Sequence, residues 1–269
     1  MPTHPSITPD PTLSAIVLAA GKGTRMKSDL PKVVHEVGGR PMVCAVVDAC
    51  LAAGCSRIVA VVGYMRERVR DALAGYGDRV AYALQEEQLG TGHAVMSAKE
   101  LYERESAAPG HSVFVLAGDG PLIRAETLRT MLDLHRRTNA AATLATSEIA
   151  DPTGYGRIVR DASGRFERIV EHRNATPEQR AIREVYPSYA VFDARALFRF
   201  LPEVPKNPAA GEYYVTDLFE LLQSRGERVE VVRAVPPEDV LSINTPDELA
   251  VVDRIYRGRA GAVVAGGGA

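Results

Sequence analysis

The sequence contains no tryptophan, only three cysteines and no apolar run of the roughly 18 residues that a membrane-spanning helix needs. Cys44, Cys50 and Cys55 lie in one short segment without the Cys-x-x-Cys spacing of a metal or redox site, so we expect them to be packing residues. Residues 1–13 are rich in proline and threonine and lack the apolar core of a signal peptide. These absences predict a cytoplasmic protein without a membrane partner.

An excess of positive charge is also missing. The chain has 32 Lys and Arg residues against 34 Asp and Glu residues, which gives a formal net charge of −2. Proteins that bind the nucleic-acid backbone depend on a strong positive field, so we do not expect nucleic acid as a partner. With 269 residues, of which 46% are hydrophobic, the chain is long enough to bury the core of one large domain.

Short runs rich in valine and isoleucine alternate with longer helical patterns through the first half of the chain. This alternation is typical of a parallel sheet whose strands are joined by crossover helices. The predicted strands are residues 15–20, 57–62, 80–84, 112–117 and 141–146, and the predicted helices are residues 41–53, 65–74, 91–101 and 125–138. We therefore predict an α/β fold with a mostly parallel central sheet and helices on both faces.

The pattern changes beyond Asp151, where two short apolar runs flank Ser163-Gly164 as in a hairpin. We predict a smaller mixed lobe over about residues 151–235. Its predicted strands are residues 157–160, 166–170, 185–192 and 229–235, and the predicted late helices are residues 213–224 and 246–257. The whole domain is predicted to span residues 13–257, between a flexible N-terminus at residues 1–12 and a flexible Gly/Ala-rich tail at residues 258–269.

A glycine-rich loop, Gly21-Lys22-Gly23-Thr24-Arg25-Met26, follows the first predicted strand. Open α/β sheets bind ligands at this end of their strands. Glycines allow backbone N–H groups to approach phosphate oxygens, and Lys22, Arg25 and Lys32 add positive charge. The spacing matches neither the Walker A loop nor the dinucleotide fingerprint, so the residues alone leave a phosphate site and an ordinary solvated turn as alternatives.

Two further segments carry polar residues at the predicted strand ends. The loop at residues 85–92 could pair its amides with a base, although a polar loop with a helix cap is also a common structural feature. Asp119, on a tight turn, could hold Mg²⁺ or simply cap a helix, and Asn244 precedes a predicted helix. We expect structural roles for His93 and His172, because transfer to an ionised phosphate needs no general base.

Taken together, these segments occur in the order seen in one family. They are Leu18 to Met26, Pro31-Lys32-Val33, Gln85 to Gly92, Gly118-Asp119, Asp151 to Ile158, Val170-Glu171-His172, Gly211 to Tyr214 and Asn244. The chain resembles the uridylyltransferase domain of the bacterial bifunctional N-acetylglucosamine-1-phosphate uridylyltransferases, which belong to the sugar-1-phosphate nucleotidyltransferases. The resemblance covers about residues 13–257.

The resemblance implies a Rossmann-like nucleotidyltransferase fold and Mg²⁺-dependent transfer of a uridylyl group from UTP to N-acetylglucosamine 1-phosphate, with release of pyrophosphate. It implies that Arg25 and Lys32 act on the phosphates and that Asp119 and Asn244 hold the metal. It also implies a sugar site that includes Gly156, Glu171 and Tyr186. The implied nucleotide site contains Leu18, Ala19, Gly21, Gly23, Gln85, Gly90 and Thr91.

The chain departs from the family in two places. The family continues into a β-helix acetyltransferase domain, so we do not expect acetyl transfer here, and we expect a monomer because that domain builds the family's trimer. The family's Asn-Thr-Gly is Tyr186-Pro187-Ser188 here, and the Tyr before Gly118 is Ala117. Sugar choice is therefore open. The alternatives are the same chemistry on another sugar 1-phosphate or nucleotide, such as UDP-glucose or dTDP-glucose synthesis, and a nucleotide-sugar sensor without turnover.

Overall fold

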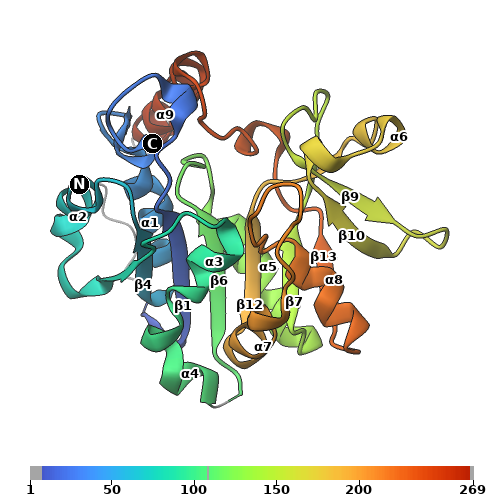
Figure 1. The fold of residues 1–269 in the computed structure, drawn as a ribbon. Coiled ribbons are helices and arrows are strands. Elements are labelled where there is room, and N and C mark those ends of the chain that lie inside the picture. The colour runs from blue at the N-terminus through green and yellow to red at the C-terminus, as the bar shows by residue number, and fades with distance from the viewer. Residues whose placement is uncertain (1–7, 108, 267–269) are drawn as a thin grey trace.

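A seven-stranded sheet forms the centre of the structure, a computed structural model that describes residues 8–107 and 109–266 (Figure 1). Its strands are, in spatial order, β13 (Val229–Val232), β7 (Ala142–Ala145), β12 (Tyr189–Asp193), β6 (Ser112–Ala117), β1 (Asp10–Ala19), β4 (Cys55–Val62) and β5 (Val80–Leu84). Neighbouring strands are parallel except at β12, which is antiparallel to both β6 and β7. The mostly parallel sheet predicted from the sequence is confirmed.

Helices cover both faces of this sheet because its strands carry apolar side chains on both sides. In β1, Ala15 and Val17 belong to one buried cluster, whereas Ile16 belongs to the other. The first cluster includes side chains of α1 (Met42–Ala52), α2 (Arg66–Leu73) and α5 (Ala125–Thr138). The second includes side chains of α3 (Thr91–Met96), α7 (Ala194–Phe200) and α8 (Asp217–Ser224). This two-sided packing fixes the strand ends that carry the candidate site.

A separate antiparallel sheet forms the smaller lobe at the right of Figure 1. Its strands are β10 (Phe166–Val170), β9 (Gly156–Arg160), β11 (Glu184–Tyr186) and β8 (Ser147–Glu148), with α6 (Pro177–Arg180) beside them. Glu184 joins the parts of this lobe, because its carboxylate pairs with Arg160 at 2.7 Å and accepts a hydrogen bond from Thr146 at 2.8 Å. The lobe sheet ends at Tyr186, so the later strands of the predicted lobe belong to the central sheet.

Residues 185–192, predicted as one strand, form two strands in different sheets. β11 ends at Tyr186 and β12 begins at Tyr189, with Ser188 at a φ of 66° between them. Pro187 has no N–H to donate to a strand ladder, and the positive φ of Ser188 turns the chain. The chain therefore passes from the lobe into the central sheet at this point and leaves Tyr186 on the lobe.

Several helix boundaries also differ from the sequence-based expectation. Helix α7 was not predicted; it begins after Asp193, whose carboxylate accepts a hydrogen bond from the N–H of Ala196 at 2.9 Å. The helix predicted at residues 213–224 begins only at Asp217, because the N–H of Tyr213 bonds to the carbonyl of Leu89 at 2.8 Å instead of entering a helix. The helix predicted at 91–101 divides into α3 and a 3₁₀ turn at Lys99–Tyr102, and a further short helix, α4 (Glu103–Ala107), follows beyond its predicted end.

The two ends of the described chain are more regular than expected. β1 already begins at Asp10, where the N–H of Asp10 donates to the carbonyl of Gly54 at 2.8 Å. The last helix, α9 (Pro246–Gly266), continues past Arg257, where the helix predicted from the sequence ends. The flexibility predicted for residues 1–12 and 258–269 otherwise stays a prediction, and residues 1–7 and 267–269 lie outside the described residues. Within the described part, no helix combines the length and apolar character that crossing a membrane requires.

Candidate active site

The predicted site residues gather around the carboxyl ends of β1, β4, β5 and β6. The loops there pack closely: a Cβ on Gly63 would lie 3.0 Å from the carbonyl oxygens of both Ala20 and Gln85. Gln88 donates through Nε2 to the carbonyl of Ala20 at 2.8 Å, and the N–H of Gly118 donates to the carbonyl of Leu18 at 3.0 Å. The ends of four strands therefore form one surface, with Leu18 and Ala19 at its centre.

The glycine-rich loop leaves β1 and closes on itself at Lys32. Gly23 has a φ of 70°, and a Cβ at this position would lie 2.5 Å from the Cβ of Lys32, so only glycine allows this close approach. Lys22 places its ammonium 5.2 Å from the centre of the Tyr64 ring, a cation–π contact. A Cβ on Gly21 would meet no atom within 4 Å, so the backbone is open to a ligand there.

Arg25, Lys32, Asp119 and Asn244 form one connected cluster. The ammonium of Lys32 pairs with the Asp119 carboxylate and donates to Oδ1 of Asn244 at 3.0 Å. Arg25 donates to the same Asn244 oxygen at 2.9 Å. The side chains of Lys32 and Asp119 are only 18% and 16% exposed, so water screens their interaction weakly. The structure thus brings together all four residues predicted to act on phosphates or metal.

The donor set of this cluster fits Mg²⁺. A carboxylate oxygen of Asp119 and the amide oxygen of Asn244 already converge on one cationic group, the ammonium of Lys32. Mg²⁺ prefers such oxygen ligands and usually takes the rest of its coordination from substrate phosphates and water. No group of three or more His, Cys, Asp or Glu side chains among the described residues could hold a metal. The site therefore suits an ion that arrives with a polyphosphate.

The loop at residues 85–92 is held by contacts that the sequence did not reveal. Gln85 is 4% exposed and donates through Nε2 to the carbonyl of Gly90 at 3.1 Å. The hydroxyl oxygen of Thr91 accepts a hydrogen bond from the N–H of Val215 at 3.0 Å, and a Cβ on Gly90 would lie 2.6 Å from the carbonyl oxygen of Tyr213. Beside this loop lies a cavity of about 470 Å³, lined by Gly63, Tyr64, Arg66, Leu84, Gln85, Glu86 and Gln88.

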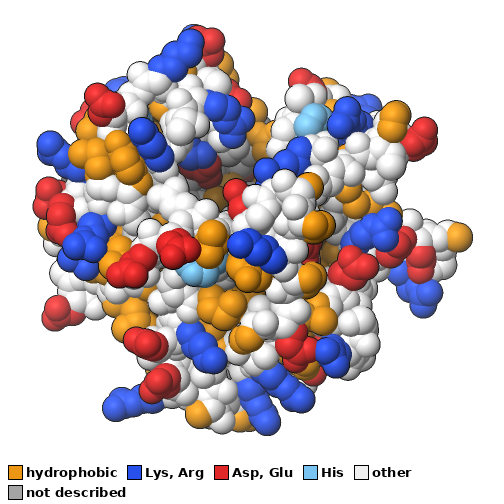
Figure 2. Space-filling view, viewed as in Figure 1, with side chains coloured by type: hydrophobic (Ala, Val, Ile, Leu, Met, Phe, Trp, Pro, Cys, Tyr) orange, Lys and Arg blue, Asp and Glu red, His pale blue; other side chains and the backbone are white. Residues whose placement is uncertain are grey.

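Gly156, Glu171 and Tyr186 come from neighbouring parts of the lobe. A Cβ on Gly156 would lie 2.8 Å from Cγ2 of Ile169 and 3.9 Å from both carboxylate oxygens of Glu171, so the close approach needs glycine. Burial raises the pKa of Glu171. Burial also raises the pKa of Tyr186, whose ring packs edge-on against Phe219 with centroids 5.8 Å apart. Figure 2 shows a recess between the α9 region and this lobe.

Comparison with known proteins identifies the family of the chain. The family of MobA-like NTP transferase domains matches residues 15–190, more than half of the chain. The chain belongs to this family. It is therefore a nucleotidyltransferase.

The curated relatives of this nucleotidyltransferase include the bifunctional protein GlmU of Halalkalibacterium halodurans, 47% identical over 247 residues that cover 91% of this chain and 52% of that protein. The corresponding protein of Geobacter metallireducens is 46% identical over 247 residues, covering 92% and 51%. The chain spans about half the length of the curated relatives it matches. A solved Bacillus anthracis chain, described as a candidate glucose-1-phosphate thymidylyltransferase in complex with sucrose, shares the fold with a TM-score of 0.74 at 17% identity, covering 91% of this chain and 95% of that one.

Two residues that the sequence did not single out connect the parts of this nucleotidyltransferase. Thr216 donates through its hydroxyl to Oε1 of Glu171 at 3.2 Å. Tyr155 donates through its hydroxyl to the carbonyl of Val240 at 3.2 Å and thereby ties the lobe to the segment that leads to Asn244. Tyr155 lies in a motif quoted above and Thr216 just beyond another, but their partners are distant in sequence, so only the fold reveals the contacts.

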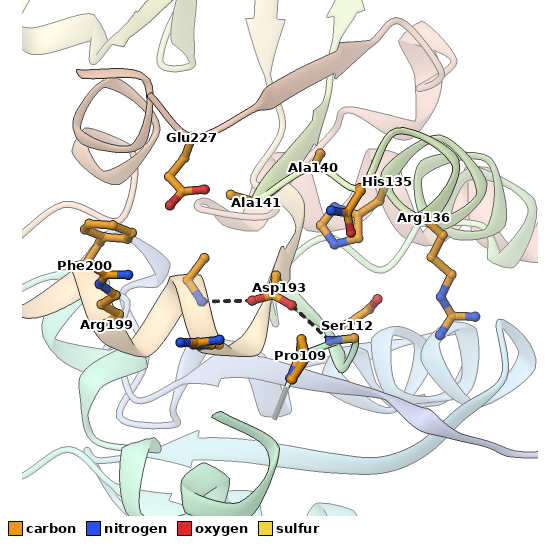
Figure 3. A pocket seen from close by; sticks show the side chains of 14 residues that line it. Pro109, Ser112, His135, Arg136, Ala140, Ala141, Asp193, Arg199, Phe200 and Glu227 are labelled. Atoms are coloured by element: carbon orange, nitrogen blue, oxygen red, sulfur yellow. Dashed lines mark hydrogen bonds between the residues drawn. The ribbon is translucent and has the colours of Figure 1, made fainter. Parts of the chain in front are cut away.

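A second hollow, of about 520 Å³, lies away from the candidate active site (Figure 3). It is lined by Ser112 at the amino end of β6, by Asp193 at the end of β12 and by residues of α5 and α7, including His135 and Arg199. None of the residues selected from the sequence lines it. Since open α/β sheets bind their ligands at the carboxyl ends of the strands, this hollow is not the candidate active site.

Proposed function

We propose that the chain catalyses Mg²⁺-dependent transfer of a uridylyl group from UTP to N-acetylglucosamine 1-phosphate, yielding UDP-N-acetylglucosamine and pyrophosphate. The observation that carries the proposal is the cluster of Arg25, Lys32, Asp119 and Asn244 at the carboxyl edge of the sheet. Such a cluster pairs two cations with two oxygen ligands, which is what a polyphosphate with its metal ion requires. The GlmU relatives support the choice of sugar phosphate and nucleotide.

In the proposed reaction, a phosphate oxygen of the sugar phosphate attacks the α-phosphorus of the nucleotide. The bond from that phosphorus to the bridging oxygen breaks, and the electron pair leaves with pyrophosphate. The attacking phosphate is already ionised, so no side chain has to remove a proton. Arg25 and Lys32 neutralise the charge that develops on the leaving group, an effect that is large in a site with little water.

Asp119 and Asn244 would hold the divalent ion, which neutralises charge on the phosphates when bound. Lys32 contacts both ligands in the structure, so it is placed to approach the same phosphates. On the lobe, the buried carboxylate of Glu171 would accept hydrogen bonds from sugar hydroxyls beside Gly156. Tyr186 would close the sugar site from β11.

A second candidate is the same reaction on another sugar 1-phosphate. It is favoured by Tyr186, which stands where the family has an asparagine and whose hydroxyl forms no hydrogen bond with any described residue. The amide that would recognise an acetamido group is therefore absent from this position.

Pyrophosphate release separates these candidates. The purified chain should be assayed with UTP and dTTP against N-acetylglucosamine 1-phosphate, glucose 1-phosphate and glucosamine 1-phosphate, each with Mg²⁺ and with excess chelator. We expect the highest kcat/KM for UTP with the acetylated sugar and no turnover with chelator. Equal or faster reaction with another pair would select the second candidate, and full activity in chelator would refute the metal assignment.

A further inference from the structure

The orientation of the Gln85 side-chain amide is determined by its neighbours. The carbonyl oxygen of Gly90 can only accept a hydrogen bond, so the Gln85 atom that lies 3.1 Å from it must be the NH₂ nitrogen, Nε2. The opposite orientation would place Oε1 against another oxygen. Oε1 has no donor among the described residues and is not fully enclosed, so it is the polar atom of Gln85 left for the adjoining cavity.

The same nitrogen also determines the state of His93. Nδ1 of His93 lies 3.1 Å from Nε2 of Gln85. Because that NH₂ group donates, Nδ1 has to accept and therefore carries no proton, which places the ring proton on Nε2. Gly90 and His93 thus occupy both hydrogens of the amide, and each contact opposes rotation of the amide by half a turn.

We propose that His93 is a positioning residue that holds Oε1 of Gln85 toward the nucleobase and so selects bases with an N–H at ring position 3. This inference rests on the proposed function, since it assigns the cavity beside residues 85–90 to the base of the nucleotide. Uracil and thymine can donate their N3–H to Oε1. Cytosine presents an unprotonated N3 there, and two acceptors would face each other.

Removal of His93 should weaken this selection without abolishing binding. Gly90 alone would restrain one hydrogen of the amide, and the other would lose its acceptor. A rotated amide would then offer NH₂ to N3 of cytosine. Asparagine at position 93 can supply an acceptor oxygen in place of Nδ1, whereas phenylalanine keeps the ring without an acceptor. His93→Phe and His93→Asn are therefore a matched pair.

The test measures Kd for UTP and for CTP by equilibrium dialysis with Mg²⁺ and without sugar phosphate. We expect the native chain to bind UTP at least ~10-fold more tightly than CTP, the effect of one unmade buried hydrogen bond. His93→Phe should lower this preference ~10-fold, mainly through weaker UTP binding, and His93→Asn should keep it within ~3-fold. His111→Phe is the control, because His111 contacts Ser14 at 2.8 Å near the opposite end of β1 and should leave the preference unchanged.

An unchanged preference in His93→Phe would overturn the proposal, as would a native chain that binds CTP as well as UTP. A general structural defect would weaken both nucleotides equally and would not be rescued by asparagine. Should His93→Phe not fold, ¹⁵N NMR of the native imidazole decides: a proton on Nδ1 contradicts the inference. Selective UTP binding without turnover on any sugar 1-phosphate would instead reject the proposed function and leave the role of His93 standing.

Discussion

At the scale of single residues, Lys32 shows how local geometry places a charge. Pro31 fixes the backbone before it, and Gly23 leaves room for its Cβ, so the ammonium reaches both Asp119 and Asn244. Arg25 approaches Asn244 from the other end of the same loop. Two cations from one short loop therefore contact side-chain oxygens of two distant segments: both donate to Asn244, and Lys32 also pairs with Asp119.

We predict that Arg25→Ala and Lys32→Ala each lower kcat by ~10²-fold or more while changing nucleotide Kd less. A cation aimed at charge that develops in the transition state contributes mainly to the rate. The check is steady-state kinetics combined with equilibrium binding of UTP. Lys27→Asn is the matched control, because Lys27 is an exposed cation of the same loop at a φ of 51°, which asparagine tolerates. A kcat retained in both alanine variants would reduce the loop to a binding element.

The cluster of Arg25, Lys32, Asp119 and Asn244 was predicted through the family resemblance, and the structure brings its members together. The residues alone left the loop undecided between a phosphate site and a solvated turn. The contact between Gln85 and His93 was not predicted, although it spans only eight positions, because the polar pattern does not say that the Gln85 side chain turns inward. Thr216 was missed because its partner, Glu171, lies 45 positions away.

At the scale of elements, the junction between β11 and β12 departs most from the sequence pattern. An apolar run from Val185 to Phe192 predicts a single strand, since periodicity carries no information about the sign of φ. Ser188 adopts a φ of 66°, where the family's motif has glycine. The strand therefore breaks at the very residues in which the chain departs from its relatives.

We expect Ser188→Gly to stabilise the protein by about 0.5–1 kcal/mol. A left-handed conformation costs a residue with a Cβ about 1–2 kcal/mol, and glycine removes this cost. Part of the gain is offset because glycine gives the unfolded chain more conformational freedom to lose on folding. Urea unfolding measures the difference. Ser224→Gly, at the end of α8 where the conformation is helical, should destabilise the protein instead. A loss of stability in Ser188→Gly would show that the turn is not strained.

Helix α8 begins with an acidic residue, Asp217, whose ionisation is disfavoured by its surroundings. Burial, followed by the charges of Glu171 and Glu220, raises the pKa of Asp217 to about 6. A raised carboxyl pKa means that the folded state binds the proton more tightly than the unfolded state, so the contribution of Asp217 to stability is greatest at low pH and falls as pH rises from about 4 to about 6.

Asp217→Asn should therefore raise the Tm above pH 6, by no more than the equivalent of about 1 kcal/mol because the carboxyl is partly exposed. Below about pH 4 the carboxyl of Asp217 is protonated in both the folded and the unfolded state, so the difference in Tm between the two proteins should vanish. Thermal unfolding of both proteins between pH 4 and 8 checks this. Asp133→Asn serves as the control, since Asp133 is exposed on α5 and is not among the charges that raise the pKa of Asp217. A Tm difference independent of pH would point to packing and not to charge.

At the scale of the whole molecule, the segment that carries Asn244 is held by contacts from three directions. Tyr155 reaches it from the lobe, through the carbonyl of Val240. Tyr189, on the central sheet, donates to the carbonyl of Asp239 at 3.1 Å. The carboxylate of Asp239 pairs with Arg124, before α5, and with Arg259 of α9. One buried aspartate thus connects the central sheet, α9 and the segment that precedes a proposed metal ligand.

Asp239→Asn should lower the free energy of unfolding by about 2 kcal/mol or more. Asp239 is 1% exposed, and removal of its charge leaves two guanidinium groups facing a neutral amide, which is costly at a buried position. Glu238→Gln is the matched control: Glu238 contacts the same Arg124 at 3.1 Å but is 52% exposed, and exposed pairs contribute less than about 1 kcal/mol. Urea unfolding of both variants tests the difference, and equal losses would refute the special role of the buried carboxylate. Because Asn244 lies only a few residues beyond Asp239, Asp239→Asn should also raise the Mg²⁺ concentration needed for half-maximal activity, whereas Glu238→Gln should leave that concentration unchanged.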